Sequence, residues 1–85
     1  MTPLPVRVMV QDVWDEIPLS LPSTTSLAEL KRRALEIARV SRDATEYVLK
    51  FRGAELPDES QSLADAGIAV NGAIIVLPRH RRPVR

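Results

Sequence analysis

Leu49-Lys50-Phe51-Arg52-Gly53-Ala54-Glu55-Leu56, followed by Ser62-Leu63-Ala64-Asp65-Ala66-Gly67-Ile68, is the stretch of sequence that decides the fold. Its first part belongs to a run with a period of two, which predicts a strand that Gly53 stops. A very short strand is expected at residues 55–56, before a turn. The second part places two apolar anchors, Leu63 and Ile68, on either side of a single helical turn.

The residues before this stretch predict a hairpin and a helix. Two alternating runs carry apolar side chains on one parity: Val6, Val8 and Val10, then Ile17, Leu19 and Leu21. The joint between them lacks Asn-Gly or Asp-Gly, so we expect a turn longer than two residues. Pro18 cannot donate to a ladder, which marks its strand as an edge or an irregular one.

The pattern changes to a helical period after Ser26, whose spacing to Glu29 has the form of a capping box. We expect a helix to about Val40, with its apolar stripe formed by Leu27, Leu30, Ala34, Ile37 and Ala38. The outer face should carry Glu29, Lys31, Arg32, Arg33, Glu36 and Arg39. Because acidic and basic residues alternate there, at spacings that favour ion pairs, we interpret this face as solvated rather than as a nucleic-acid surface.

The last part of the sequence predicts a central strand and with it the fold class. Asn71-Gly72 is a turn signal, and residues 73–77 are apolar on both parities, as in a central strand. A hairpin, one helix, and a last strand buried on both sides describe an α+β domain, a β-grasp in which a mixed sheet of four to five strands packs on one helix. We predict that residues 1–78 form this domain and that residues 79–85 form a basic, flexible tail.

Composition excludes several functions. The 85 residues contain no cysteine and one histidine, His80, so we expect no disulfide, no metal site and no cofactor. No gathered catalytic set is evident, and we expect that the chain is not an enzyme. No apolar run is long enough for a membrane span, and no signal peptide is evident, which predicts a cytoplasmic protein.

The order and spacing of these elements resemble ubiquitin and its relatives over residues 6–79. The resemblance is most specific in the stretch quoted first, and the capped helix start after Pro22 also fits it. Conjugated members of that family end in two glycines, whereas this chain ends Arg82-Pro83-Val84-Arg85. The resemblance therefore implies a ubiquitin-like protein of bacterial type that is not conjugated. A modifier or carrier activated at a processed C-terminus is the alternative.

The resemblance also points to a binding face on the sheet. By strand parity, the side opposite the helix should hold Met9, Val48, Lys50, Ile75 and Leu77. Lysine replaces the central isoleucine of ubiquitin's patch at position 50, so ubiquitin's usual binders should not recognise it. A cluster this apolar indicates a protein-contact surface, unless the tail or edge loops cover it. Trp14, near the hairpin turn, is either an interface anchor or part of the rim of the core.

Two charged segments have open interpretations. Asp12, Asp15 and Glu16 are interpreted as a solvated acidic turn rather than as a metal or acid–base site. Residues 79–85 carry four of the twelve basic side chains and no acidic one. They form a tail that docks on an acidic partner, or is inert, or binds nucleic acid or an acidic membrane weakly.

The function predicted from the sequence is a non-covalent interaction module or small accessory subunit. Its partners would be proteins, without specific nucleic acid and without membrane insertion, and the chain itself would be a monomer or a weak homodimer. Bacterial proteins that it resembles in size and fold include the accessory proteins of type VII secretion systems and the small subunits of multicomponent monooxygenases.

Overall fold

The computed structural model describes residues 3–11, 13, 15–41 and 43–78. It contains one α-helix, one 3₁₀ turn and five strands within those residues. The elements, in chain order, are β1 (Leu4–Val10), β2 (Asp15–Leu21), α1 (Leu27–Ile37), η1 (Ala44–Glu46), β3 (Tyr47–Phe51), β4 (Ala54–Glu55) and β5 (Gly72–Pro78).

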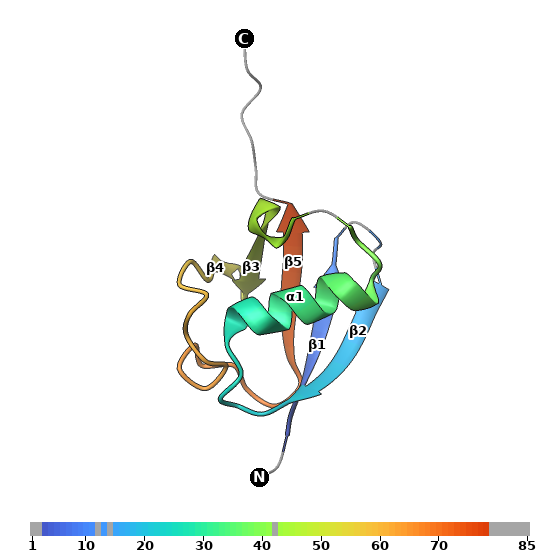
Figure 1. The fold of residues 1–85 in the computed structure, drawn as a ribbon. Helices are drawn as coiled ribbons and strands as arrows, with labels where there is room; N and C mark the ends of the chain where they lie inside the picture. The colour runs from blue at the N-terminus through green and yellow to red at the C-terminus, as the bar shows by residue number, and fades with distance from the viewer. Residues whose placement is uncertain (1–2, 12, 14, 42, 79–85) are drawn as a thin grey trace.

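The strands form a single mixed sheet in the order β2-β1-β5-β3-β4. β5 runs parallel to β1, and the other neighbours are antiparallel. β5 therefore occupies the centre, as its apolar residues on both parities predict. β2, which contains Pro18, is an edge strand. Figure 1 shows α1 crossing one face of this sheet, so the predicted α+β architecture is confirmed.

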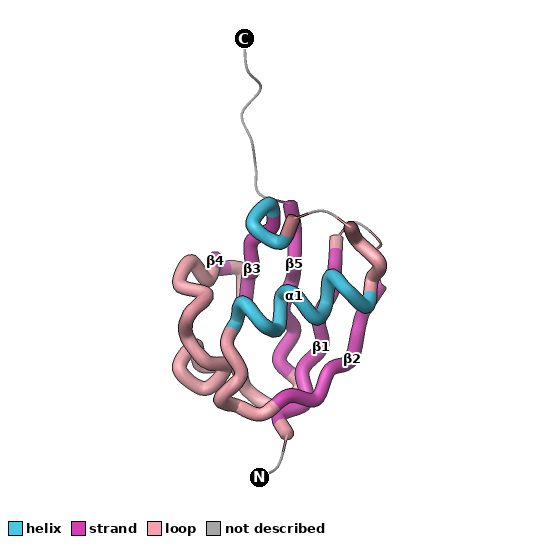
Figure 2. Tube along the Cα trace, in the orientation of Figure 1, coloured by secondary structure: helices cyan, strands magenta, loops and turns pink. Residues whose placement is uncertain are grey.

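The core lies between α1 and the sheet. Alternate residues of the strands point into it, among them Val8, Leu49 and Ile74, and α1 contributes Leu27 and Leu30 from the other side. Leu63 and Ile68, the two anchors of the predicted helical turn, are also buried there. Figure 2 shows the loop that carries them, between β4 and β5, lying beyond β3 and β4 and close to the start of α1.

The start of α1 is fixed by a cap and by that loop. The Ser26 hydroxyl accepts a hydrogen bond from the backbone N–H of Glu29 at 3.1 Å, as the capping pattern predicts. The N–H groups of Leu27 and Ala28 donate to the carbonyl oxygens of Gln61 and Glu59. Two of the amides that a helix leaves unpaired in its first turn are thus bonded to a segment more than thirty residues further along the chain.

The helix differs from the sequence prediction at its end and in its stripe. It stops at Ile37 rather than near Val40, because Arg39 has a left-handed φ of 61°. Ile37 is 52% exposed, so its assignment to the apolar stripe was wrong. Leu35 takes that place in the core. The buried stripe is turned toward Lys31 and Leu35, and Lys31 on that side forms an ion pair with Glu59 of the loop before β5.

Lys31 also departs from the prediction. It was placed on the solvated outer face, but it is only 4% exposed. Its ammonium donates to the backbone carbonyl of Tyr47 at 2.9 Å and forms an ion pair with Glu59. A lysine can occupy a buried position when its charge is paired and its donors are bonded, and the sequence pattern around Lys31 does not reveal those partners.

Candidate functional site

The candidate site is the face of the sheet that α1 does not cover, which we call the open face. The core side takes Val8, Leu49 and Ile74, so the alternate residues of the same strands point to the opposite side. On β1, β3 and β5 these are Arg7, Met9, Val48, Lys50, Ala73, Ile75 and Leu77.

Strand register places the predicted binding residues side by side. Met9 lies opposite Ile75 in the parallel β1–β5 pair, and Ile75 lies opposite Lys50 in the antiparallel β3–β5 pair. One row across the central strands therefore reads Met9, Ile75, Lys50. Leu77 lies opposite Val48 in the next row toward the end of β5. Five of the six residues predicted for the site share one contiguous face.

Exposure within this face is uneven. Ile75 is 42% exposed, the largest exposure among the four apolar residues predicted there. Met9 and Leu77 are half-buried, as is Lys50. Val48 is only 8% exposed and adds little surface, although it is not part of the core cluster. The accessible apolar surface of the open face thus comes chiefly from Ile75, with Met9 and Leu77 beside it.

Three cations border the apolar residues. Arg7 bonds to the carboxylate of Glu16 at 3.2 Å and to the carbonyl oxygen of Asn71 at 3.3 Å, both on the surface. Lys50 and Arg52 form no ion pair within the described part of the chain. Glu55 lies opposite Lys50 in the β3–β4 register without closing one. The two charges remain available to an external group.

A pocket adjoins this face where β5 begins, and sequence reasoning did not find it. It encloses about 490 Å³ between the β3–β4 turn and residues 69–73, and Ile75 and Ala73 belong to both the pocket and the open face. Its other walls include Phe51, Arg52 and Val70. Val70 and Arg52 were available as signals, because each stands next to a turn signal, at Asn71-Gly72 and at Gly53.

The remaining sequence candidates lie either outside the described residues or on β2. Trp14, Asp12 and the tail 79–85 lie outside the described residues. Asp15 is exposed on β2. Glu16 lies opposite Met9 in the β1–β2 pair and forms an ion pair with Arg7, so the structure brings this carboxylate to the edge of the open face. Among the residues that the structure describes, no group of three acidic or histidine side chains is placed to hold a metal ion.

The pKa shifts in the described residues have local causes away from the open face. Hydrogen bonds and charge from Arg32 and Arg33 lower the pKa of Glu29 to about 2. Hydrogen bonds from Thr45 lower the pKa of Asp43, and those from Ser60 lower the pKa of Asp58. These carboxylates stabilise a helix face and two turns.

Within the described residues, no helix combines the length and apolar character needed to cross a membrane.

Comparisons with known proteins identify the fold. No protein family model and no curated protein match this chain. Solved protein structures do match this chain. The solution structure of the ubiquitin-like domain of an Arabidopsis thaliana protein is 18% identical, with a TM-score of 0.78 over 100% of this chain and 86% of that one. A second structure of that plant protein gives a TM-score of 0.75 at 18% identity, with 100% and 96% covered.

The ubiquitin of Caldiarchaeum subterraneum is 10% identical and superimposes with a TM-score of 0.78, over 95% of this chain and 99% of that one. At such identities the likeness establishes the arrangement of the backbone and nothing finer. The mixed five-stranded sheet with β1 and β5 parallel at its centre, packed on one helix, is a ubiquitin-like β-grasp fold.

Proposed function

We propose that this chain is a non-covalent protein-interaction module, or a small accessory subunit, that binds a protein partner through the open face and performs no catalysis itself. The observation that carries the proposal is the row of Met9, Ile75 and Lys50, held in register by three neighbouring strands on the side away from α1. Strands of a sheet place such side chains without loop ordering, so binding here costs little conformational entropy.

The composition of the open face supports this role. Apolar residues lie at its centre, and cations lie among and beside them, which is the anatomy of a contact that excludes water in the middle and is polar at its rim. A protein partner fits this surface better than nucleic acid does, because the described cations are few and interspersed with aliphatic side chains rather than aromatic ones. We place the complex in the cytoplasm of a bacterium.

The test is a pull-down from the lysate of the native source, followed by mass spectrometry under native and denaturing conditions. The bait proteins are the wild type, Leu77→Asp, Ile75→Asp and a form lacking residues 79–85. Ile37→Asp is the matched control, since it places the same charge at a comparably exposed aliphatic residue on α1. Circular dichroism and thermal unfolding verify that each bait is folded.

Partners that bind wild type and Ile37→Asp, and that are lost with Leu77→Asp and Ile75→Asp, support the open face. Loss only on removal of residues 79–85 would instead assign binding to the tail. The alternative function is a modifier or carrier activated at a processed C-terminus, and it is favoured by the fold it shares with an archaeal ubiquitin. Adducts that survive denaturation and gain about the mass of this domain would establish that function.

A further inference from the structure

The pocket beside the open face is built around an arginine in an unusual backbone position. β3 and β4 are joined by two residues, Arg52 and Gly53, whose φ angles are 56° and 80°. Two successive positive φ values define a tight hairpin turn in which asparagine or glycine is preferred at the first position. Arginine at this position carries a backbone cost, and residues held in such conformations cluster at binding sites.

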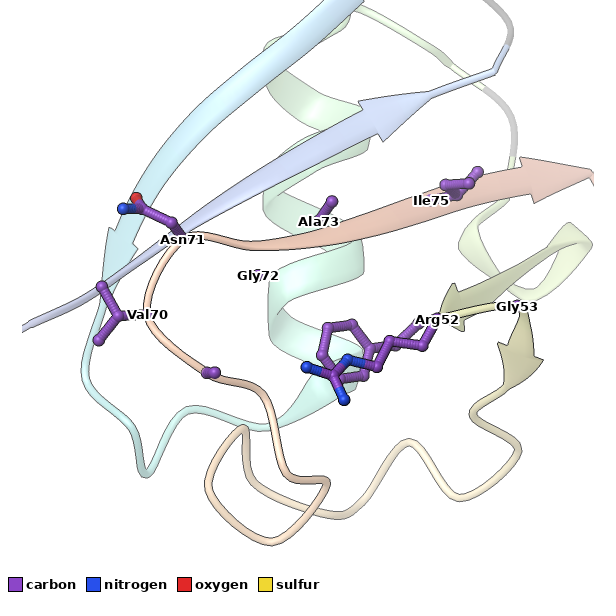
Figure 3. A pocket seen from close by; sticks show the side chains of 9 residues that line it. Arg52, Gly53, Val70, Asn71, Gly72, Ala73 and Ile75 are labelled. Carbon is purple, nitrogen blue, oxygen red and sulfur yellow. The ribbon is translucent and has the colours of Figure 1, made fainter.

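The turn directs the Arg52 side chain along the pocket. Its guanidinium carbon lies 5.5 Å from the centroid of the Phe51 ring, within the range of a cation–π contact. Figure 3 shows the Arg52 side chain beside the start of β5, on the pocket side of the turn. The ring contact orients the guanidinium but leaves its N–H donors without a carboxylate in the described part of the chain.

Apart from Asn71, the rest of the pocket is lined by apolar residues and glycines, and Gly72 shapes it. Val70 is 64% exposed, more than any other large hydrophobic residue described, and Figure 3 shows it at the opposite end of the lining residues from Ile75. A Cβ on Gly72 would come within 3.0 Å of the Ala69 carbonyl oxygen and 3.1 Å of Phe51 Cε1. Gly72 therefore lets the loop lie close against the Phe51 ring at this end of the pocket.

We propose that the pocket receives an apolar side chain from an acidic peptide segment of the partner, with one carboxylate of that segment bound by Arg52 and another by Lys50. This inference rests on the proposed function and extends it to the chemistry of the partner. Arginine binds carboxylates through two parallel hydrogen bonds, which fixes the position of the segment as well as its charge. Val70, Ile75 and the Phe51 ring then bury the apolar side chain.

The same charges argue against a second copy of this chain as the occupant. A symmetric contact whose two-fold axis passes close to Lys50 and Arg52 would bring these cations of each copy toward those of the other. Like charges in a desolvated contact are unfavourable, whereas an acidic segment relieves both of them.

The test begins with a phage-displayed library of random linear peptides selected on the full chain. We expect enriched sequences in which Asp or Glu flanks one aliphatic or aromatic residue. Dissociation constants of the enriched peptides are then measured by fluorescence polarisation. Arg52→Glu and Val70→Asp should each weaken binding by about tenfold or more, since a charge-assisted hydrogen bond accounts for roughly that factor. Replacing the peptide's acidic residues with Asn or Gln should have the same effect.

Arg39→Glu is the matched control. Arg39 is also an exposed arginine with a left-handed φ, of 61°, but it follows α1 and does not line the pocket. It should leave peptide affinity within twofold of wild type. Circular dichroism verifies the fold of each variant.

Other outcomes overturn the inference in distinguishable ways. One such outcome is a set of peptides that bind Arg52→Glu and Val70→Asp normally but fail to bind Leu77→Asp. That result would show that the open face binds the peptide and that the pocket does not contribute to binding. Recovery of only neutral or basic sequences, or of none, would reject the acidic partner. A dimer in analytical ultracentrifugation that Val70→Asp dissociates would make the occupant a second copy of the chain.

Discussion

The Lys31 ammonium lies 2.7 Å from a carboxylate oxygen of Glu59, and these two residues connect three parts of the fold that are distant in sequence. Lys31 is on α1, Glu59 is in the loop between β4 and β5, and the same ammonium also reaches the carbonyl oxygen of Tyr47 at the start of β3. One buried cation thus joins the helix, the sheet and the long loop.

Removing Lys31 should destabilise the protein strongly. Lys31→Ala deletes the cation, leaves Glu59 without its partner and opens a cavity beside the core. Breaking a buried ion pair in this way costs about 3–5 kcal/mol, and the partial exposure of Glu59 places the expectation at the lower end, about 3 kcal/mol. Urea unfolding followed by circular dichroism measures it.

Arg33→Ala is the comparison for Lys31→Ala, because it removes a cation from an exposed pair with Glu29 on the same helix. Its cost should be about 0–1 kcal/mol. Equal losses of stability in the two variants would show that the Lys31–Glu59 contact has no special structural role.

The corrected apolar stripe of α1 predicts opposite outcomes for two neighbouring residues. Leu35→Ala should lower the free energy of unfolding by about 2–4 kcal/mol, because the leucine is buried in the core. Ile37→Ala should change it by no more than about 0.5 kcal/mol, because that side chain is half exposed. Chemical denaturation of both variants measures these free energies of unfolding. A larger loss of stability for Ile37→Ala than for Leu35→Ala would support the stripe predicted from the sequence.

Glu29 should titrate far below an ordinary glutamate. Arg32 bonds to both of its carboxylate oxygens, at 2.6 and 3.2 Å, and Arg33 adds a third contact at 3.1 Å. These contacts lower the pKa of Glu29 from 4.5 to about 2. Since the folded pKa is depressed, the stabilisation is present above about pH 4.5 and is lost as the pH falls toward 2.

Carbon-detected NMR titration of the Glu29 carboxyl group measures this pKa directly. Arg32→Ala should raise it part of the way back, because Arg33 remains in place, and Arg39→Ala should not move it. A wild-type value near 4.5 would show that these surface contacts do not persist in solution.

The β3–β4 turn should be more sensitive at its second residue than at its first. Gly53→Ala should cost about 1 kcal/mol, and the cause is purely conformational, since no atom lies within 4 Å of the added Cβ. Arg52→Asn should raise the stability slightly, because asparagine adopts a left-handed φ more readily than arginine. Thermal unfolding of both variants checks the prediction, and stabilisation by Gly53→Ala would contradict the positive φ.

Local patterns in the sequence were sufficient for most of the fold. The period of two in Val6, Val8 and Val10 marked the buried face of β1, because adjacent strand residues must point to opposite sides. The spacing of Ser26 and Glu29 marked the start of α1, since the cap satisfies a helix donor from three residues away. Each of these signals depends on contacts within a few residues.

The candidate site was also predictable only in part, because local patterns do not show which strands are neighbours. Parity along each strand predicted that Met9, Lys50 and Ile75 leave the core, but only the pairing of β1, β5 and β3 decided that they form one row. The turn signals beside Arg52 and Val70 did not by themselves predict the pocket, because its walls come from segments about twenty residues apart that only the folded chain brings together at the start of β5.

The sequence by itself determined where strands form to within one or two residues, where the helix begins and which parity of β1 is buried, because these properties follow from local backbone geometry and apolar periodicity. The short strand lies at Ala54–Glu55 rather than at 55–56. Only the tertiary structure decided that Lys31 is buried, since its charge is paired with Glu59 in a loop distant in sequence, and that Ile37 is exposed. It alone brought Arg52, Val70 and Ile75 to the lining of one pocket. Burial and proximity are properties of the assembled chain, and residues distant in sequence determine them.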